Sequence, residues 1–169
     1  MVLFDISEQQ SGNRERLRRY LRSRGFGCLQ LSVWVSPHPL DLESAALKGI
    51  AADVASLILL DARPAAGESD AEIVRAAWDF EEIDKRYTAV LAVLDSRPRD
   101  ALRSAADAQR LRQWAERERA AWIRAAAADP LLPRVLWPSG YMGERAWRRR
   151  KKEFREVGRL LAQFDAANA

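Results

Sequence analysis

The chain has 169 residues, of which 48% are hydrophobic and 31% are charged, and its formal net charge is +4. This length and composition predict one ordinary globular domain or two small ones that share an interface, and they exclude a disordered tail. No apolar run approaches the ~20 residues that a bilayer span requires, so we expect no membrane segment.

Cysteine and histidine are too scarce for most small catalytic or metal centres. Cys28 is the single cysteine and His38 is the single histidine, which excludes an internal disulfide and argues against a zinc site. The chain also lacks the G-x-S-x-G turn that would support a serine hydrolase. We therefore expect a protein with no cofactor and no enzymatic activity, and the cytoplasm is the default compartment.

The first third of the chain alternates between strand-like and helix-like segments. In chain order, the pattern predicts a strand over 2–6, a helix over 14–24, one or two strands over 26–35, a helix over 41–53 and a strand over 55–62. Gly25 marks the end of the first helix because glycine adopts a left-handed cap without steric cost. The order βαββαβ predicts a ferredoxin-like domain, in which two helices cover one face of a small antiparallel sheet.

Segment 26–35 shows the period-two pattern of a strand. The odd-numbered positions carry aliphatic side chains, which are Leu29, Leu31, Val33 and Val35. The positions between them carry Gln30, Ser32 and Trp34. Tryptophans are core residues by default, and Cys28 is expected to be buried in this strand.

The remainder of the chain has helical spacing, so the fold class is α+β. The predicted elements are a helical stretch over 70–97 with a break near residue 79, a helix over 100–128, a loop over 130–143 and a final helix that reaches residue 164. Asp129-Pro130 ends the second of these helices, since the residue before a proline disfavours helix. We therefore predict a ferredoxin-like dimerisation domain over 1–66 and a helical domain over 67–169.

Arginine is concentrated early in the chain, over 14–24, and again near its end. Such clusters are typical of surfaces that contact nucleic acid or phosphorylated ligands, although a solvated helix face is the plainer explanation. We take Arg14, Arg18 and Arg22 as the candidate nucleic-acid contacts.

The second basic run, over 148–152, lies between Trp147 and Phe154. These two aromatic residues are seven positions apart, so both are expected to face the core while the basic side chains fan outward. The run then has two interpretations, a site for the phosphates of coenzyme A or DNA and a plain solvated face.

Several stretches together resemble the PaaX family of bacterial transcriptional repressors. Those that resemble its central domain are VLFDI at 2–6, GFG at 25–27 and SVWVSP at 32–37, and those that resemble its C-terminal domain are AWDF at 77–80, Tyr87 and DPLLP at 129–133, with Pro138 and Gly143. The resemblance implies a cytoplasmic, DNA-binding homodimer whose repression is relieved by an acyl-coenzyme A, typically phenylacetyl-coenzyme A.

The same resemblance implies an N-terminal winged helix that makes the main DNA contacts. In this sequence Met1 opens directly on the first strand, so we expect at most weak nucleic-acid binding by the chain itself. The base-reading function would then belong to a domain outside it.

The front domain also resembles the small subunit of the CRISPR spacer-acquisition complex, through Phe4-Asp5-Ile6 and Gln30-Leu31-Ser32-Val33. That resemblance implies a ferredoxin-like dimer in which Asp5 holds a divalent metal at the dimer axis. Alternative functions are therefore a metal-dependent nuclease and a nucleic-acid-binding adaptor. The plainer role for Asp5 is to accept hydrogen bonds from the following turn.

A candidate effector site combines an aromatic slot with nearby cations, the two features that an acyl-coenzyme A requires. The residues predicted to form it are Trp78, Trp137, Tyr141, Arg145, Arg148 and Arg149. The competing interpretation is that this loop only packs the last helix against its neighbours.

Overall fold

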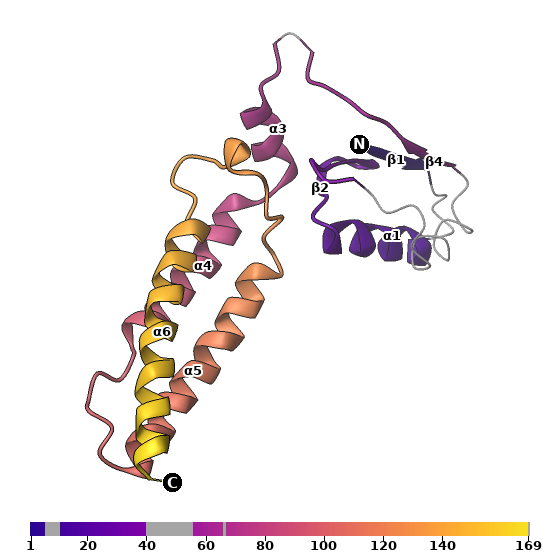
Figure 1. Ribbon diagram of the computed structural model, residues 1–169. Helices are drawn as coiled ribbons and strands as arrows, with labels where there is room; N and C mark the ends of the chain where they lie inside the picture. Colours follow the sequence, from indigo (N-terminus) through magenta and orange to yellow (C-terminus); the bar gives the residue numbers. More distant parts are fainter. Residues whose placement is uncertain (6–10, 40–55, 66, 169) are drawn as a thin grey trace. The chain divides into compact units, whose positions relative to one another are not determined.

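The structure is a computed structural model, and it describes residues 1–5, 11–39, 56–65 and 67–168 (Figure 1). It confirms the α+β class. The elements are β1 Val2–Asp5, α1 Ser11–Ser23, β2 Gly27–Gln30, β3 Val33–Val35, β4 Ser56–Leu59, α3 Asp70–Ala77, α4 Phe80–Asp95, α5 Ala105–Ala126, the 3-10 turn η2 Arg134–Leu136 and α6 Gly143–Ala167. The helix predicted over 41–53 lies outside the described residues.

The chain divides into two compact units. Unit 1 comprises residues 1–80 and 129–139, and unit 2 comprises residues 81–128 and 140–169. These two units have other bounds than the domains expected over 1–66 and 67–169, because unit 1 also includes residues 129–139. The domain boundary expected from the sequence stays a prediction. Unit 1 joins the sheet to α3 and to the loop that carries η2.

The sheet of unit 1 has four strands in the order β2-β3-β1-β4, and each neighbouring pair is antiparallel. Val2 of the central strand β1 stands opposite Trp34 of β3 on one side and Leu59 of β4 on the other. Strands β2 and β4 therefore form the edges. The ferredoxin-like arrangement also requires a second helix, which falls on residues outside the described part, so that arrangement stays a prediction.

Helix α1 covers one face of this sheet (Figure 1). Leu17 and Leu21 lie one turn apart on α1 and are fully buried, as four-residue spacing on an amphipathic helix requires. They pack against the inward side chains of the strands, Val2, Phe4 and Trp34, together with Phe26. This cluster is the hydrophobic core of the sheet.

The segment predicted as a period-two strand over 26–35 is a hairpin, and its inward face differs from the simple alternation. The backbone turns at Leu31 and Ser32, and the pairing shifts register between Cys28 and Gln30. As a result Leu31 is 84% exposed while Trp34 is 0% exposed. The irregularity re-aims the side chains, and it leaves Cys28 half-buried rather than buried.

Unit 2 is helical, with α4, α5 and α6 as its elements. The helical stretch over 70–97 breaks at residues 78–79, as the sequence predicts. The second helix begins at Ala105 rather than near residue 100, because Ser104 and Asp107 form a reciprocal capping box there. Among the described residues, none of the helices combines the length and apolar character needed to cross a bilayer.

Candidate functional site

Three sequence-distant segments meet in unit 1 at Gly25, which contacts both the Trp78 indole and the Pro130 backbone. The Trp78 Nε1 donates a hydrogen bond to the carbonyl oxygen of Gly25 at 3.3 Å. A Cβ placed on Gly27 would lie 2.6 Å from the Ala77 carbonyl oxygen and 2.6 Å from the Trp78 ring. Gly25 has a φ of +78°, and its Cβ would lie 3.1 Å from the Pro130 carbonyl oxygen. We call Gly25, Gly27, Trp78 and Pro130 the motif junction.

The loop after Pro130 is held by its own hydrogen bonds. The Asp129 carboxylate accepts from the Leu131 N–H at 2.8 Å, and Leu131 takes a φ of 51°. The Trp137 Nε1 donates to the Leu132 carbonyl oxygen at 2.7 Å. The indole N–H of Trp137 is therefore hydrogen-bonded within the loop, and residues 129–139 of this loop belong to unit 1.

Beside the motif junction lies a cavity of about 350 Å³, which we call the Trp78 cavity. Its lining comes from several segments of unit 1: Met1, Leu29, Val35, Ser36, Pro37, Ala62, Arg63, Pro64, Asp70, Ile73, Val74, Trp78 and Leu136. The walls are mainly apolar, and the charged side chains among them are Arg63 and Asp70. An aromatic wall beside apolar walls with few charges is typical of a small-molecule site.

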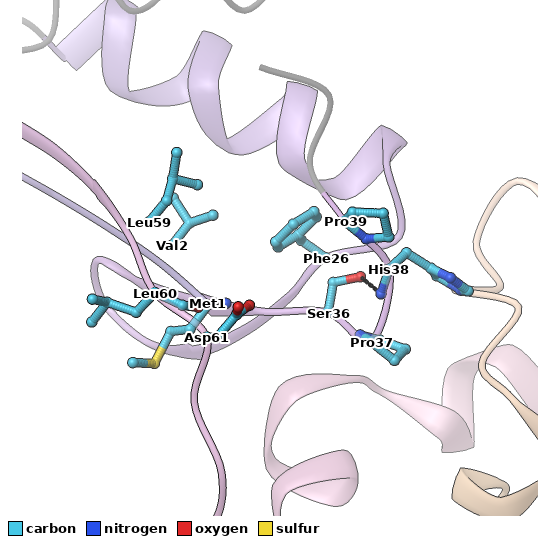
Figure 2. Close-up of a pocket in the computed structure, with 10 residues that line it drawn as sticks. All are labelled: Met1, Val2, Phe26, Ser36, Pro37, His38, Pro39, Leu59, Leu60 and Asp61. Carbon is cyan, nitrogen blue, oxygen red and sulfur yellow. Dashed lines mark hydrogen bonds between the residues drawn. The ribbon is translucent and has the colours of Figure 1, made fainter.

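A neighbouring cavity of about 460 Å³ shares Met1, Ser36 and Pro37 with it (Figure 2). The His38 N–H donates to the Ser36 Oγ at 3.0 Å, and the His38 ring points away from the other lining side chains in Figure 2. Pro37, His38 and Pro39 line this cavity from the segment that follows β3.

The predicted effector residues are distributed over both units. Trp78 and Trp137 belong to unit 1, whereas Tyr141 and the three arginines belong to unit 2. Within unit 2, the Tyr141 ring packs edge-on against Tyr87, with ring centroids 6.0 Å apart. The effector site as we defined it from the sequence stays a prediction.

The arginines of that predicted site differ in how they are held. Arg145 is exposed. Arg148 forms an ion pair with Glu144, one turn earlier on α6. The Arg149 guanidinium contacts the Glu153 carboxylate at 3.0 Å and the Asp95 carboxylate at 3.0 Å. Arg149 therefore contributes to the structure of unit 2, and its removal would also affect stability.

The expectation that this basic run fans outward is wrong for Arg150, and Trp147 is not a core residue. Arg150 Nε donates to Glu118 at 2.8 Å, and the guanidinium lies 4.9 Å from the centroid of Trp122 and 4.7 Å from that of Phe154. Trp147 is 48% exposed, and its ring packs at a tilt against Trp122 with the ring centroids 5.5 Å apart. The cation takes the inward position because two aromatic faces and a carboxylate receive it.

Unit 2 also contains a buried ionic cluster that the sequence analysis missed. Arg97 donates to Glu153 at 2.5 Å and to Glu156 at 2.8 Å, and Arg99 contacts Glu153 at 3.2 Å. Burial alone would raise the pKa of Glu153, but hydrogen bonds from Arg97, Arg149 and Arg99 outweigh it and lower the pKa to about 2. The available signal was the spacing of Glu153 and Val157, which places the carboxylate on the apolar stripe of α6.

Glu118 is a second charged residue on an apolar stripe. It lies between Trp114 and Ala121 on the buried face of α5, and its side chain is fully buried. Burial raises the pKa of Glu118, while the nearby Arg150 opposes that rise. One carboxylate oxygen accepts from Arg150, and the other has no partner among the described residues.

The candidate nucleic-acid residues on α1 are partly used in packing. Arg22 lies 3.5 Å from the Glu15 carboxylate, and its guanidinium sits 5.3 Å from the Trp34 ring centroid. Arg18 donates to the Leu31 carbonyl oxygen at 3.4 Å, and Arg14 is half-buried. All three belong to one helix, but none of them is simply a solvated cation.

Asp5 ends β1 on the surface, opposite Ser56 in the register of β4. Within the part of the chain that the structure describes, histidine, cysteine, aspartate and glutamate residues form no group of three or more that could hold a metal ion. A metal on Asp5 would therefore need ligands from elsewhere, as the resemblance to a dimeric relative implied.

The architecture defines an α+β unit with a small antiparallel sheet, joined in sequence to a helical unit. Comparisons with known proteins agree with this. The family model described as the PaaX protein central Cas2-like domain matches residues 1–74, so this part of the chain is similar to that domain.

Among solved structures, the uncharacterized protein Rv0674 from Mycobacterium tuberculosis is similar over 99% of this chain, with a TM-score of 0.60 and 24% identity. This likeness shows a shared fold. The chain spans 62% of the length of that structure. No curated protein matches the sequence.

Proposed function

We propose that this chain is the regulatory body of a PaaX-like transcriptional repressor, and that it senses an acyl-coenzyme A. The observation that carries the proposal is the match of residues 1–74 to the PaaX central domain. It is supported by the motif junction, where Trp78 and Pro130, which lie beyond the matched residues, pack against Gly25 and Gly27 within unit 1. The strand order β2-β3-β1-β4 also supports a ferredoxin-like sheet.

Effector sensing predicts a selective change in stability. A ligand that binds the folded chain and not the unfolded chain increases the free energy of unfolding, by about 2.7 kcal/mol at a concentration 100 times its Kd. The melting temperature rises as a result. We expect phenylacetyl-coenzyme A or a related aryl thioester to raise the melting temperature more than coenzyme A alone does. Equal effects of the two, or none from any acyl-coenzyme A tested, would remove the sensing part of the proposal.

We further propose that the chain works as a cytoplasmic homodimer. The edge strand β4 and the residue after it expose a short apolar run, Ile58, Leu59 and Leu60. An exposed apolar edge favours pairing with a second copy, and a two-fold dimer is the commonest closed assembly. Sedimentation velocity at about 10 to 50 μM, a range suited to ordinary affinities, should give a dimer. A Leu59→Lys variant should shift it toward monomer, and a monomer of the unmutated chain would contradict the assembly.

A nucleic-acid adaptor is the second candidate, because Arg16 and Arg19 are exposed on α1 next to the arginines already described. An adaptor would bind duplexes regardless of sequence, with an affinity that falls steeply with salt. The regulatory body tested by itself would bind weakly, and sequence discrimination at nanomolar concentration would contradict our proposal. Fluorescence anisotropy with operator and random duplexes at two salt concentrations measures both properties.

We propose that the chain has no catalytic activity. The competing nuclease would need Asp5 carboxylates from two copies to share a magnesium ion. Its signature is Mg²⁺-dependent cleavage of DNA or RNA that disappears in Asp5→Asn. Such cleavage would contradict the proposal and would favour the nuclease.

A further inference from the structure

We propose that the Trp78 cavity binds a compact aryl or branched apolar group that ends in a carbonyl, and so recognises the acyl end of the effector. This inference rests on the proposed sensing function and places the acyl group in the Trp78 cavity, whose lining includes neither Trp137 nor Tyr141. It assigns recognition to unit 1 alone. The occupant is a carboxylic acid of this kind or its thioester, and the experiment below separates the two.

The size and walls of the cavity carry the first step. Its volume of about 350 Å³ lies at the lower end of the range for ligand pockets, which fits a small molecule or one end of a larger one. The apolar walls come from different segments, with Leu29 on β2, Val35 on β3, Ile73 on α3 and Leu136 on η2. A nucleotide with several phosphates would find too little positive charge here.

The second step is the fixed position of the aromatic wall. The Trp78 Nε1 donates a hydrogen bond to the Gly25 carbonyl oxygen at 3.3 Å. The backbone of Gly27 lies so close to the ring that a Cβ added there would be 2.6 Å from it. The ring therefore cannot swing out without breaking the motif junction. An aromatic side chain that is held in this way offers a flat surface at little entropic cost, because its rotamer is already fixed.

The third step is charge complementarity. Arg63 is the single arginine or lysine among the described lining residues, and it lies in the segment that follows β4. One cation suits one carbonyl or carboxylate, because a guanidinium donates hydrogen bonds to such oxygens. Asp70 lines the same cavity and would repel a second negative group. The cavity therefore favours one oxygen-bearing end on an apolar body.

The test follows the indole N–H of Trp78 in ¹H–¹⁵N spectra of the full chain, assigned with Trp78→Phe. Phenylacetyl-coenzyme A, free phenylacetate and coenzyme A are the probes. We expect the Trp78 signal to move with the thioester or with the free acid, and to stay in place with coenzyme A alone.

Two variants of the same chemistry locate the site. Ile73→Trp fills the cavity from α3 and should weaken binding at least about tenfold, which corresponds to about 1.4 kcal/mol. Ile123→Trp is the matched control, because Ile123 is 56% exposed on α5 in the other unit. It should bind as the unmutated chain does. Melting curves of both variants show whether each is folded. If Ile73→Trp does not fold, the Trp78 signal of the unmutated chain decides whether the ligand binds in the cavity.

The outcomes separate this inference from the proposed function. Movement of the Trp78 signal with free phenylacetate but not with the thioester would support the cavity and count against coenzyme A sensing. Calorimetric binding of the thioester with no movement of Trp78, or with equal binding by Ile73→Trp, would overturn the cavity and leave the sensing function standing. No movement with any probe would overturn the cavity.

Discussion

Replacing Glu153 with alanine should lower the free energy of unfolding by about 3 kcal/mol or more, the range seen when one partner of a buried ion pair is removed. The reason is the burial of the pair, since the side chains of Arg97 and Glu153 are 2% and 5% exposed. The variant leaves the Arg97 guanidinium inside unit 2, with Glu156 as its remaining carboxylate partner among the described residues. Urea unfolding followed by far-UV circular dichroism measures the change.

The control for this variant is Glu81→Ala. Glu81 pairs with Lys85 at 2.7 Å on the exposed face of α4, and exposed pairs of this kind contribute less than about 1 kcal/mol. Equal losses in the two variants would show that the Arg97–Glu153 cluster does not stabilise unit 2.

Acid gives an independent readout of the same cluster. The pKa of Glu153 is about 2 in the folded chain, below its ordinary value of 4.5. A lowered folded-state pKa contributes stability above the unfolded value, and that contribution is lost as the pH falls from about 4.5 to about 2. The pKa of Glu118 is raised, so its contribution has the opposite sign and is lost as the pH rises. Glu153→Ala should therefore show a smaller loss of stability between pH 4.5 and pH 2 than the unmutated chain.

Replacing Gly27 with alanine should lower stability by about 1 to 3 kcal/mol, the usual cost of overpacking. The added Cβ would meet the Ala77 carbonyl oxygen and the Trp78 ring at 2.6 Å, and backbone at that distance must shift. The same shift should loosen the hydrogen bond from Trp78 to Gly25. Thermal unfolding gives the stability, and the Trp78 indole N–H signal reports the displacement.

Gly12 provides the matched control within the same unit. It lies in α1, and nothing stands within 4 Å of a Cβ added there. Because glycine weakens a helix by roughly 0.5 to 1 kcal/mol relative to alanine, Gly12→Ala should leave stability unchanged or increase it. A Gly27→Ala variant as stable as Gly12→Ala would mean that β2 does not approach Trp78 this closely.

Much of the fold follows from short-range patterns in the sequence. The four- and three-residue spacing of apolar side chains predicts α1, α4, α5 and α6, and Gly25 ends α1 with the expected positive φ. Period-two spacing predicts strands over 26–35 but not their inward face. That face depends on the turn at Leu31 and on the register shift after Cys28, which are set by pairing between strands rather than by local sequence.

The candidate site was less accessible to sequence reasoning. The motifs that contain Gly25, Trp78 and Pro130 could be interpreted one by one, but only the folded chain shows that Trp78 and Pro130 both contact Gly25. The buried cluster around Glu153 was missed because a glutamate beside a basic run is usually a solvent-exposed partner. Contacts more than 50 residues apart, such as Arg97 with Glu153, leave no local periodic signal.

The central claim is that this chain is the effector-sensing body of a PaaX-like repressor. Isothermal titration calorimetry of phenylacetyl-coenzyme A into the full chain tests it most directly, with coenzyme A and phenylacetate as separate titrants and a shorter aliphatic thioester as a fourth. The account predicts saturable binding of the aryl thioester at one site per chain, tighter than that of coenzyme A. Binding of coenzyme A and its thioesters with equal affinity, or no heat from any of them, would contradict it.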